Sequence, residues 1–373
     1  MSKSRIKVGV VGMGIGRAHL EGYLALPDEV EVVALCDLDK TRLKAIGQEY
    51  NVPLQFADFD LLFQSGEIEA VSICLPNNLH AQACVSALEA GIHVLCEKPL
   101  AHTLASAQTV VEAVDRASSK FMICYNRRYR ADLRWIKSLL SGEGLGQIYQ
   151  VKAGWIRETG IPMGWFTQKG VSGGGSLIDL GIHMLDAALW LLDYPPPLTV
   201  SGEVRAKFGP QGEKIWLFRS GQPGTFDVED SAMAFVRLAG GVTLTLETSW
   251  ASHNRPGLDD FFITLMGTQG TVELHVANYA AENTLTLYTE INGVPVVSRP
   301  AVKSAKSDHA HVVAEFVNAI REDRVPAASA EQGFVIMKII EAIYESARRG
   351  REIVVGEEGV LGEPDHPGFW SVT

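Results

Sequence analysis

The stretch Gly9-Val-Val-Gly12-Met13-Gly14-Ile15-Gly16 decides the fold of this chain. It follows an apolar run, Lys7–Val11, that predicts a buried strand, and it opens a segment of helical periodicity. Glycines at such a turn let the backbone approach a pyrophosphate, which the N–H groups and positive dipole end of the helix can hold. We therefore expect residues 12–16 to contact a dinucleotide. The spacing is GxGxG rather than GxGxxG, so a tight turn without a ligand is the alternative.

Outward from this turn, short apolar runs alternate with helical patterns as far as residue 125. The predicted strands are Lys7–Val11, Val30–Cys36, Ala70–Leu75, His93–Cys96 and Phe121–Tyr125. The predicted helices are Arg17–Ala25, Asp39–Glu49, Leu79–Ala90 and Leu104–Ala117. This alternation predicts right-handed βαβ units and a doubly wound parallel sheet of the Rossmann type over residues 1–125.

The second predicted strand ends in an acid, Asp37, 25 residues after Gly12. A carboxylate at that place can accept hydrogen bonds from the adenine ribose and repel a 2′-phosphate. The pattern therefore favours NAD over NADP. The alternative is that Asp37 or Asp39 caps the next helix.

Two polar clusters follow later strands, at the edge where open α/β sheets bind ligands. The first is Pro76-Asn77-Asn78-Leu-His80, and the second is Glu97-Lys98-Pro99. A lysine near a nicotinamide can bond its ribose and a substrate hydroxyl. For each cluster, the alternative is a polar loop.

The pattern changes after about residue 145, where long alternating segments predict a large open sheet, antiparallel or mixed. Its predicted strands are Ile148–Ile156, Leu198–Lys207, Ser231–Leu238, Val242–Ser249, Phe261–Met266, Thr271–His275 and Thr284–Tyr288. A final helical stretch, 308–349, is broken at Pro326. We therefore expect a C-terminal α+β domain over residues 126–355. A Gly/Pro-punctuated tail over 356–373 is either a strap on a neighbour, which we favour, or a surface tail.

One apolar helix, predicted over Ser176–Leu192, carries the strongest chemical signal. It begins with Gly173-Gly-Gly and places Asp179, His183 and Asp186 at i, i+4 and i+7, on one face. Two carboxylates and an imidazole on a core-like helix carry a desolvation cost that functional sites tolerate. A structural Asp–His pair is the alternative.

Composition excludes several classes of function. The formal net charge of −11 argues against nucleic acids and anionic membranes, and no run approaches the roughly 20 apolar residues of a membrane span. The N-terminal apolar run is short, broken by glycines and lacks a cleavage site, so a buried strand is preferred to a signal peptide. The five cysteines include no CxxC pair, which predicts a reducing cytoplasm. His309 and His311 would point to different faces of a helix, and we expect no metal site.

In this order, GVVGMGIGRAH, the Asp-ended strand, PNNLH, CEKP and GGGSLIDLGIHMLD resemble the Gfo/Idh/MocA family over roughly residues 6–355. The resemblance implies a Rossmann domain and a C-terminal α/β domain whose open sheet packs against another subunit. It also implies hydride transfer between NAD(P) and a ring carbon of a sugar, sugar derivative or cyclitol. We expect a homodimer or homotetramer.

The resemblance further assigns roles to individual residues. Lys98, Asp179 and His183 look like the catalytic site, with neutral His183 as base, Asp179 as orienting group and Lys98 as polarising cation. The expected cofactor contacts are residues 12–16 (Gly12, Met13, Gly14, Ile15 and Gly16), Asp37, Pro76, Asn77, His80, Glu97 and Lys98. The expected substrate contacts are Lys98, Asn126, Arg128, Trp155, Arg157, Asp179 and His183.

The substrate is less readable. Aromatic side chains in 155–169 could stack on a sugar face, and Arg157 could hold an anionic substituent; a loop with solvated charges is the alternative. A second candidate is the segment 250–255, from Trp250 to Arg255. Two other functions remain open. One is a redox-neutral NAD-dependent glycosidase or lyase that oxidises, eliminates and returns the hydride, and the other is a non-catalytic NAD-binding sensor.

Overall fold

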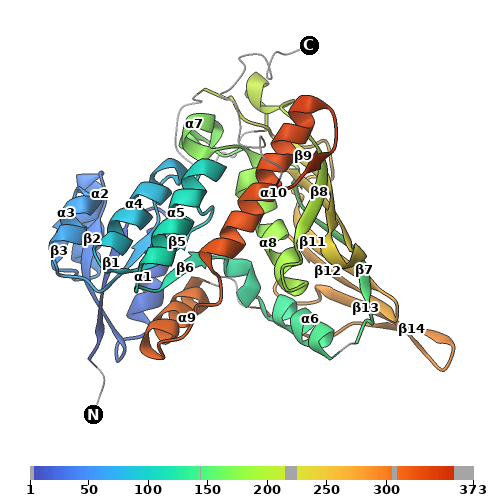
Figure 1. Cartoon of the computed structure of the whole chain (residues 1–373), viewed down its shortest axis with the longest axis horizontal. Helices are drawn as coiled ribbons and strands as arrows, with labels where there is room; N and C mark the ends of the chain where they lie inside the picture. The colour runs from blue at the N-terminus through green and yellow to red at the C-terminus, as the bar shows by residue number, and fades with distance from the viewer. Residues whose placement is uncertain (1–3, 143, 215–224, 305–308, 357–373) are drawn as a thin grey trace. The chain divides into compact units, whose positions relative to one another are not determined.

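The computed structural model describes residues 4–142, 144–214, 225–304 and 309–356. The chain divides into two compact units (Figure 1). Unit one holds the described residues up to Asn126 together with 309–334, and unit two holds the described residues from Arg127 to 304 and from Val335 onward. The sequence-based division places 309–334 in the second domain, whereas these residues cluster with unit one. The predicted C-terminal strap, residues 357–373, lies outside the described residues.

Unit one is built on a six-stranded parallel sheet in the order β3-β2-β1-β4-β5-β6. Its strands are β1 (Ile6–Val11), β2 (Val30–Cys36), β3 (Leu54–Phe56), β4 (Ala70–Ile73), β5 (His93–Glu97) and β6 (Phe121–Cys124). The order reverses between β1 and β4, so the carboxyl ends of these strands flank the switch point where such sheets bind ligands. The predicted Rossmann sheet is confirmed, with β3 as an additional short strand.

Helices connect the strands of unit one. They are α1 (Gly16–Leu24), α2 (Lys40–Glu49), α3 (Phe59–Gln64), α4 (Asn77–Glu89) and α5 (Leu104–Arg116). Asp39, Asp58 and Thr103 cap α2, α3 and α5 by accepting backbone N–H bonds. Short polar side chains thus fix where the helices begin, and buried apolar faces hold the helices against the sheet.

A late segment of the chain completes unit one. Helix α9 (His309–Arg321) packs on α1, where a Cβ at Gly22 would lie 3.1 Å from a methyl of Val313. The carbonyl of Ala328 then accepts the N–H of Ile123 in β6 at 3.0 Å. Helix α10 (Ala330–Arg349) begins in this unit and ends in the other. The predicted break at Pro326 thus separates two helices.

Unit two contains a nine-stranded mixed sheet in the order β14-β13-β12-β11-β7-β10-β9-β8-β15. Only β7 with β10 pairs in parallel among the described pairs of this sheet. Its strands are β7 (Ile148–Arg157), β8 (Pro197–Arg205), β9 (Ser231–Leu238), β10 (Thr243–Ser249), β11 (Asp259–Gly267), β12 (Gly270–Ala277), β13 (Leu285–Ile291), β14 (Val294–Ser298) and β15 (Ile353–Val354). The predicted mostly antiparallel or mixed sheet is confirmed.

One face of this sheet is covered by helices α8 (Ile182–Leu191) and α10 (Figure 1). Alternate side chains of β9, such as Ala234 and Val236, are buried on that face, while Met233 is 60% exposed on the other. Helices α6 (Ala131–Ser141) and α7 (Lys169–Ser172) complete the unit. No helix in the described residues is long and apolar enough to cross a membrane.

Candidate functional site

The glycine turn of unit one assigns a different physical role to each of three glycines. Gly12 has φ +87°, and a Cβ there would lie 2.3 Å from the carbonyl oxygen of Cys74. A Cβ on Gly16 would lie 3.1 Å from Val10, so this glycine lets α1 pack closely on β1. A Cβ on Gly14 would meet no atom within 4 Å. Gly12 and Gly16 are thus required because a side chain would clash with the surrounding structure, whereas Gly14 leaves open space at the start of α1.

Asp37 lies at the end of β2, and its carboxylate accepts the N–H of Met13 at 2.7 Å and that of Asp39 at 2.8 Å. Asp39, not Asp37, caps α2 by accepting the N–H groups of Thr41 and Arg42. The helix-cap alternative for Asp37 is therefore excluded. The contact with Met13 also fixes the distance between the glycine turn and the second strand.

These features fit a bound dinucleotide. The start of α1 supplies N–H groups and a positive dipole end for a pyrophosphate, and Asp37 supplies acceptors for a ribose. Within the turn, the Met13 side chain is buried and its N–H is used by Asp37, while Ile15 is 46% exposed. Gly14 and Ile15 are therefore the turn residues that present accessible surface.

The predicted cluster at residues 76–80 begins α4. Pro76 is the residue before the helix, and Asn77 is its buried first residue. His80 is fully buried, with Nδ1 2.7 Å from the carbonyl oxygen of Pro99 and Nε2 2.8 Å from that of Leu75. Burial lowers the pKa of His80 below the usual imidazole value. In this geometry the His80 side chain links the loop after β4, at Leu75, to the loop after β5, at Pro99. Contact between His80 and a nicotinamide stays a prediction.

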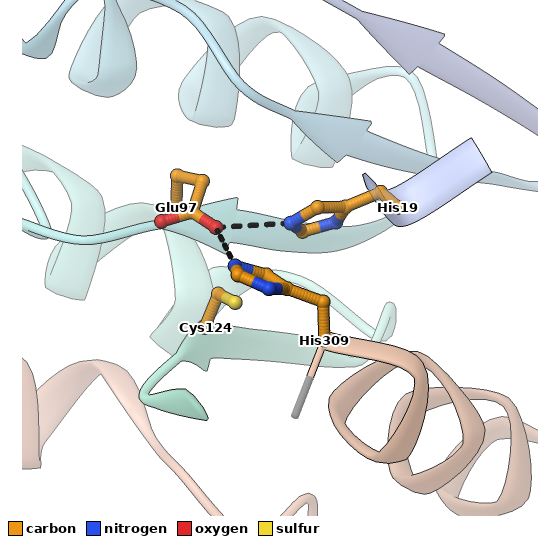
Figure 2. A group of neighbouring side chains, drawn as sticks. All are labelled: His19, Glu97, Cys124 and His309. Atoms are coloured by element: carbon orange, nitrogen blue, oxygen red, sulfur yellow. Dashed lines mark hydrogen bonds and ion pairs between the residues drawn. The ribbon is translucent and has the colours of Figure 1, made fainter. Parts of the chain in front are cut away.

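Glu97 and Lys98 follow one another at the carboxyl end of β5. The Lys98 side chain is half-buried, whereas Glu97 is buried with its carboxylate 2.9 Å from Nε2 of His19 (Figure 2). The same carboxylate accepts the N–H of Lys98 at 3.1 Å. Glu97 thus fixes the backbone that carries Lys98, and its contact with the cofactor stays a prediction.

In unit two, the helix that carries Asp179 and His183 begins as a π-helix over Leu177–Gly181 and continues as α8. The N–H of Ile182 donates to the carbonyl of Leu177, five residues earlier. Such wide turns occur at functional sites because they redirect side chains. The indole Nε1 of Trp250 donates to Asp179 Oδ2 at 2.9 Å, and the ring of His183 lies 5.8 Å from that of Trp155.

Glu229 holds the beginning of this helix. Its fully buried carboxylate accepts the N–H groups of Gly175 at 2.9 Å and Leu177 at 2.8 Å, and the hydroxyl of Tyr344 at 3.1 Å. Burial raises the pKa of Glu229 to about 7, although these donors favour its anion. A Cβ on Gly174 would lie 1.9 Å from the Tyr344 hydroxyl, and one on Gly175 1.8 Å from the Glu229 carbonyl oxygen. The glycine run therefore makes room for the Tyr344 side chain and for the backbone of Glu229.

Trp155 and Arg157 are both predicted to bind substrate. In unit two the Trp155 ring packs against the rings of Phe261 and Tyr279. Asp259 Oδ1 accepts Nε1 of Trp155 at 2.6 Å and Nε of Arg157 at 3.1 Å. Arg157 also donates to the Tyr279 hydroxyl at 3.0 Å. The guanidinium of Arg127 lies 4.8 Å from the Trp155 ring centre. Arg157 is thus already paired with a carboxylate, which weakens the case for an anionic substrate.

Arg128, predicted to bind substrate, forms a buried ion pair in unit two. Its guanidinium is buried and donates to both oxygens of Asp186, with the shortest contact 2.6 Å, and to the hydroxyl of Tyr194. This bidentate pair explains how Asp186 is accommodated on an apolar helix. Arg128 is engaged in a structural ion pair, so the geometry does not favour substrate binding. Asn126, in unit one, has its amide nitrogen 3.4 Å from Nε2 of His309.

The predicted catalytic residues fall in both units, Lys98 in unit one and Asp179 with His183 in unit two. Sequence reasoning missed Glu229, Asp259 and Tyr279. Glu229 and Asp259 lie just before or at the start of strands, and the acidic run Asp227-Val-Glu229-Asp230 was a usable signal. Their hydrogen-bond partners come from distant segments, which sequence spacing does not reveal.

Comparison with known proteins agrees with this arrangement. Residues 6–125 match the oxidoreductase family's NAD-binding Rossmann fold, and residues 137–355 match its C-terminal alpha/beta domain. D-glucoside 3-dehydrogenase from Escherichia coli (strain K12) is 30% identical over 357 residues, 95% of this chain and 98% of that protein. Levoglucosan dehydrogenase from Pseudarthrobacter phenanthrenivorans is 26% identical over 386 residues, 92% of this chain and 96% of that protein. A solved structure of a levoglucosan dehydrogenase in complex with NADH and levoglucosan has a TM-score of 0.82 at 22% identity, covering 95% of this chain and 100% of that one.

The Rossmann unit, its glycine turn and the full-length matches define an NAD(P)-binding oxidoreductase whose relatives include sugar dehydrogenases. The chain belongs to the Gfo/Idh/MocA family.

Proposed function

We propose that this protein is an NAD-dependent dehydrogenase that oxidises a ring hydroxyl of a neutral glucose-like sugar or glycoside. The observation that carries the proposal is the helix start at 175–183, where an otherwise apolar helix presents a carboxylate and an imidazole. The full-length similarity to D-glucoside 3-dehydrogenase supports a glucoside as substrate and its C3 hydroxyl as the reacting group. The pairing of Arg157 with Asp259 supports a neutral ring.

We assign three roles to side chains of this chain. His183 takes the proton of the reacting hydroxyl, because an unperturbed imidazole titrates near working pH. Asp179, oriented by Trp250, accepts a hydrogen bond from the sugar. Lys98 stabilises the oxygen as negative charge develops on it. The bound nicotinamide supplies a hydride acceptor.

The preference for NAD is assigned to Asp37. A carboxylate held 2.7 Å from the Met13 nitrogen repels a 2′-phosphate placed at the end of β2. Arg42, 3.7 Å from the same carboxylate, offers a cation once the acid is removed. Asp37→Ala should lower the ratio of kcat/KM with NAD to kcat/KM with NADP by at least about tenfold. An unchanged ratio would remove Asp37 from this role.

The decisive experiment is a proton NMR time course in D₂O with purified protein, NAD⁺ and a panel of sugars, inositols, acidic sugars and methyl glycosides. A 3-keto product with stoichiometric NADH from a neutral glucoside is the expected result. Glycoside cleavage with catalytic NAD⁺, and deuterium at the carbon beside the transient ketone, would replace the proposal by the redox-neutral reaction. Preference for an acidic sugar would contradict the interpretation that Arg157 is held by Asp259 and does not bind an anionic substrate.

We further propose that the open face of the nine-stranded sheet binds a second copy of this chain. A groove on that face is lined by apolar side chains among polar ones, including Met233, Phe235 and Phe262. Met233→Glu should shift the mass measured by light scattering toward the monomer, whereas Glu89→Gln, at an exposed position of α4 in unit one, should not. A wild-type monomer at micromolar concentration would overturn this assignment.

We also assign the enzyme to a reducing cytoplasm, because its five cysteines are buried free thiols.

A further inference from the structure

Four potential metal ligands converge inside unit one, and only one of them, Glu97, has been given a role above. They are His19 of α1, Glu97 of β5, Cys124 of β6 and His309 of α9, called here the HECH cluster (Figure 2). One donor atom from each lies within 4.8 Å of the other three. We propose that the HECH cluster binds a zinc ion that fastens α9 to the Rossmann sheet.

The donor types and distances suit zinc. Zinc takes four ligands in a tetrahedron, with bonds of about 2.0–2.3 Å to nitrogen, oxygen and sulfur, which separates the donors by roughly 3.3–3.8 Å. Glu97 Oε1 lies 2.9 Å from Nε2 of His19 and 3.6 Å from Nε2 of His309. These two separations lie close to the tetrahedral value, and all four donor atoms lie within 4.8 Å of one another.

The charge balance also suits a divalent ion. The side chain of His19 is fully buried and that of Glu97 is 9% exposed, so an uncompensated charge among them is costly. A dication with one carboxylate, one thiolate and two neutral imidazoles has no net charge. Binding to the ion removes the Cys124 proton, since coordination deprotonates a thiol outright.

A second layer of side chains orients His19. Its Nδ1 lies 3.0 Å from the hydroxyl of Ser72, which lies 2.9 Å from the hydroxyl of Tyr23. Imidazoles that bind metals nearly always donate their other N–H in this way, which leaves Nε2 as the ligand atom. The side chain of His309 is 15% exposed, so the cluster meets solvent on the side of α9.

The cluster could not be predicted from residue spacing, because its four residues come from four separate elements. His309 was paired with its neighbour His311, and that spacing does not suit a metal site. In the structure His311 is exposed, whereas His309 faces the cluster, so the two residues form a matched pair for mutation.

The test uses the full chain, reduced, loaded with zinc and passed through a desalting column, with zinc counted by mass spectrometry. We expect about one zinc per chain, reduced at least about tenfold in His309→Ala and Cys124→Ser. His311→Ala and Cys84→Ser, at another buried cysteine, should keep the zinc. Ser72→Ala should weaken zinc affinity by about 10–100-fold. Wild-type protein that leaves the column without zinc, or equal zinc in His309→Ala, would overturn the proposal.

Cobalt provides a readout that does not depend on mutation. Cobalt in the wild-type site should show a thiolate-to-metal charge-transfer band and the intense visible bands of tetrahedral coordination. Cobalt bound without the charge-transfer band would place the metal elsewhere and contradict the HECH cluster. Zinc should also raise the melting temperature, because an ion that binds only the folded chain stabilises it. A melting temperature unchanged by zinc and by chelator would argue for a purely hydrogen-bonded cluster.

Discussion

The indole nitrogen of Trp250 donates a hydrogen bond to Asp179 Oδ2 at 2.9 Å, from a side chain with no exposed surface. A hydrogen bond to a charged group is worth about 1.5–3 kcal/mol. If Asp179 must be oriented for catalysis, Trp250→Phe should lower kcat by about 10–100-fold and leave NAD affinity unchanged. Steady-state kinetics with Trp190→Phe as control would measure this. Equal kcat values in the two variants would show that Asp179 needs no such orientation.

Removal of the assigned base should have a larger effect. General acid–base catalysis contributes about 10²–10⁴ in rate, so His183→Ala should lose at least ~100-fold in kcat. NAD affinity, measured by calorimetry, should be unaffected, because the change lies in unit two. The surface variant His311→Ala is the control. Near-full turnover in His183→Ala would assign the proton to another group.

Substitutions at two positions of the glycine turn should affect stability and cofactor binding differently. Gly12→Ala adds a Cβ 2.3 Å from a carbonyl oxygen at φ +87°, where the backbone penalty alone is about 1–2 kcal/mol. We expect a lower melting temperature and no measurable NAD binding. Gly14→Ala meets no atom within 4 Å, so its melting temperature without cofactor should match the wild type. Its NAD affinity should nevertheless fall by about tenfold or more. Unchanged affinity in Gly14→Ala would contradict the position given to the pyrophosphate.

Glu229 should make stability depend on pH. Its pKa is about 7 in the folded chain because of burial, above the ordinary value of 4.5. The folded chain therefore binds this proton more tightly, and the resulting stability, present below pH 4.5, is lost as pH rises to about 7. The total is on the order of 3 kcal/mol. Glu229→Gln should remove this dependence, so its melting temperature relative to wild type should rise between pH 5 and pH 8. Glu89→Gln, at an exposed position of α4, should follow the wild-type profile. A parallel profile for Glu229→Gln would show that Glu229 stays ionised.

Most strands and helices with strong periodicity were predicted within a few residues of their observed bounds, although the amphipathic helix Ala131–Ser141 was missed. Val30–Cys36 and Ser231–Leu238 agree in full, because alternating or continuous burial imposes a clear pattern. The short strand Leu54–Phe56 and the helix Phe59–Gln64 were missed, since three to six residues carry too little periodicity. The exposed hairpin strand Val294–Ser298 was missed for a related reason, because it has no fully buried side chain.

The candidate site was predictable where one segment carries both the residue and its structural context. The glycine turn, Asp37 and the Asp179–His183 helix meet this condition. Glu229 and Asp259 do not meet this condition, since each accepts hydrogen bonds from residues that are distant in sequence. Arg128 shows the same difficulty in reverse. The family resemblance placed it among the substrate contacts, yet its ion-pair partner Asp186 lies 58 residues away along the chain.

Helix α9 also affects the order in which the protein can mature. It closes the side of unit one at α1, where Gly22 is fitted to Val313. A growing polypeptide on the ribosome would therefore display the first six strands while this apolar surface is still bare. The nucleotide-binding unit therefore lacks one of its packing helices for as long as α9 has not been made. Its packing becomes complete only once residues 309–334 have been synthesised, after most of the second unit.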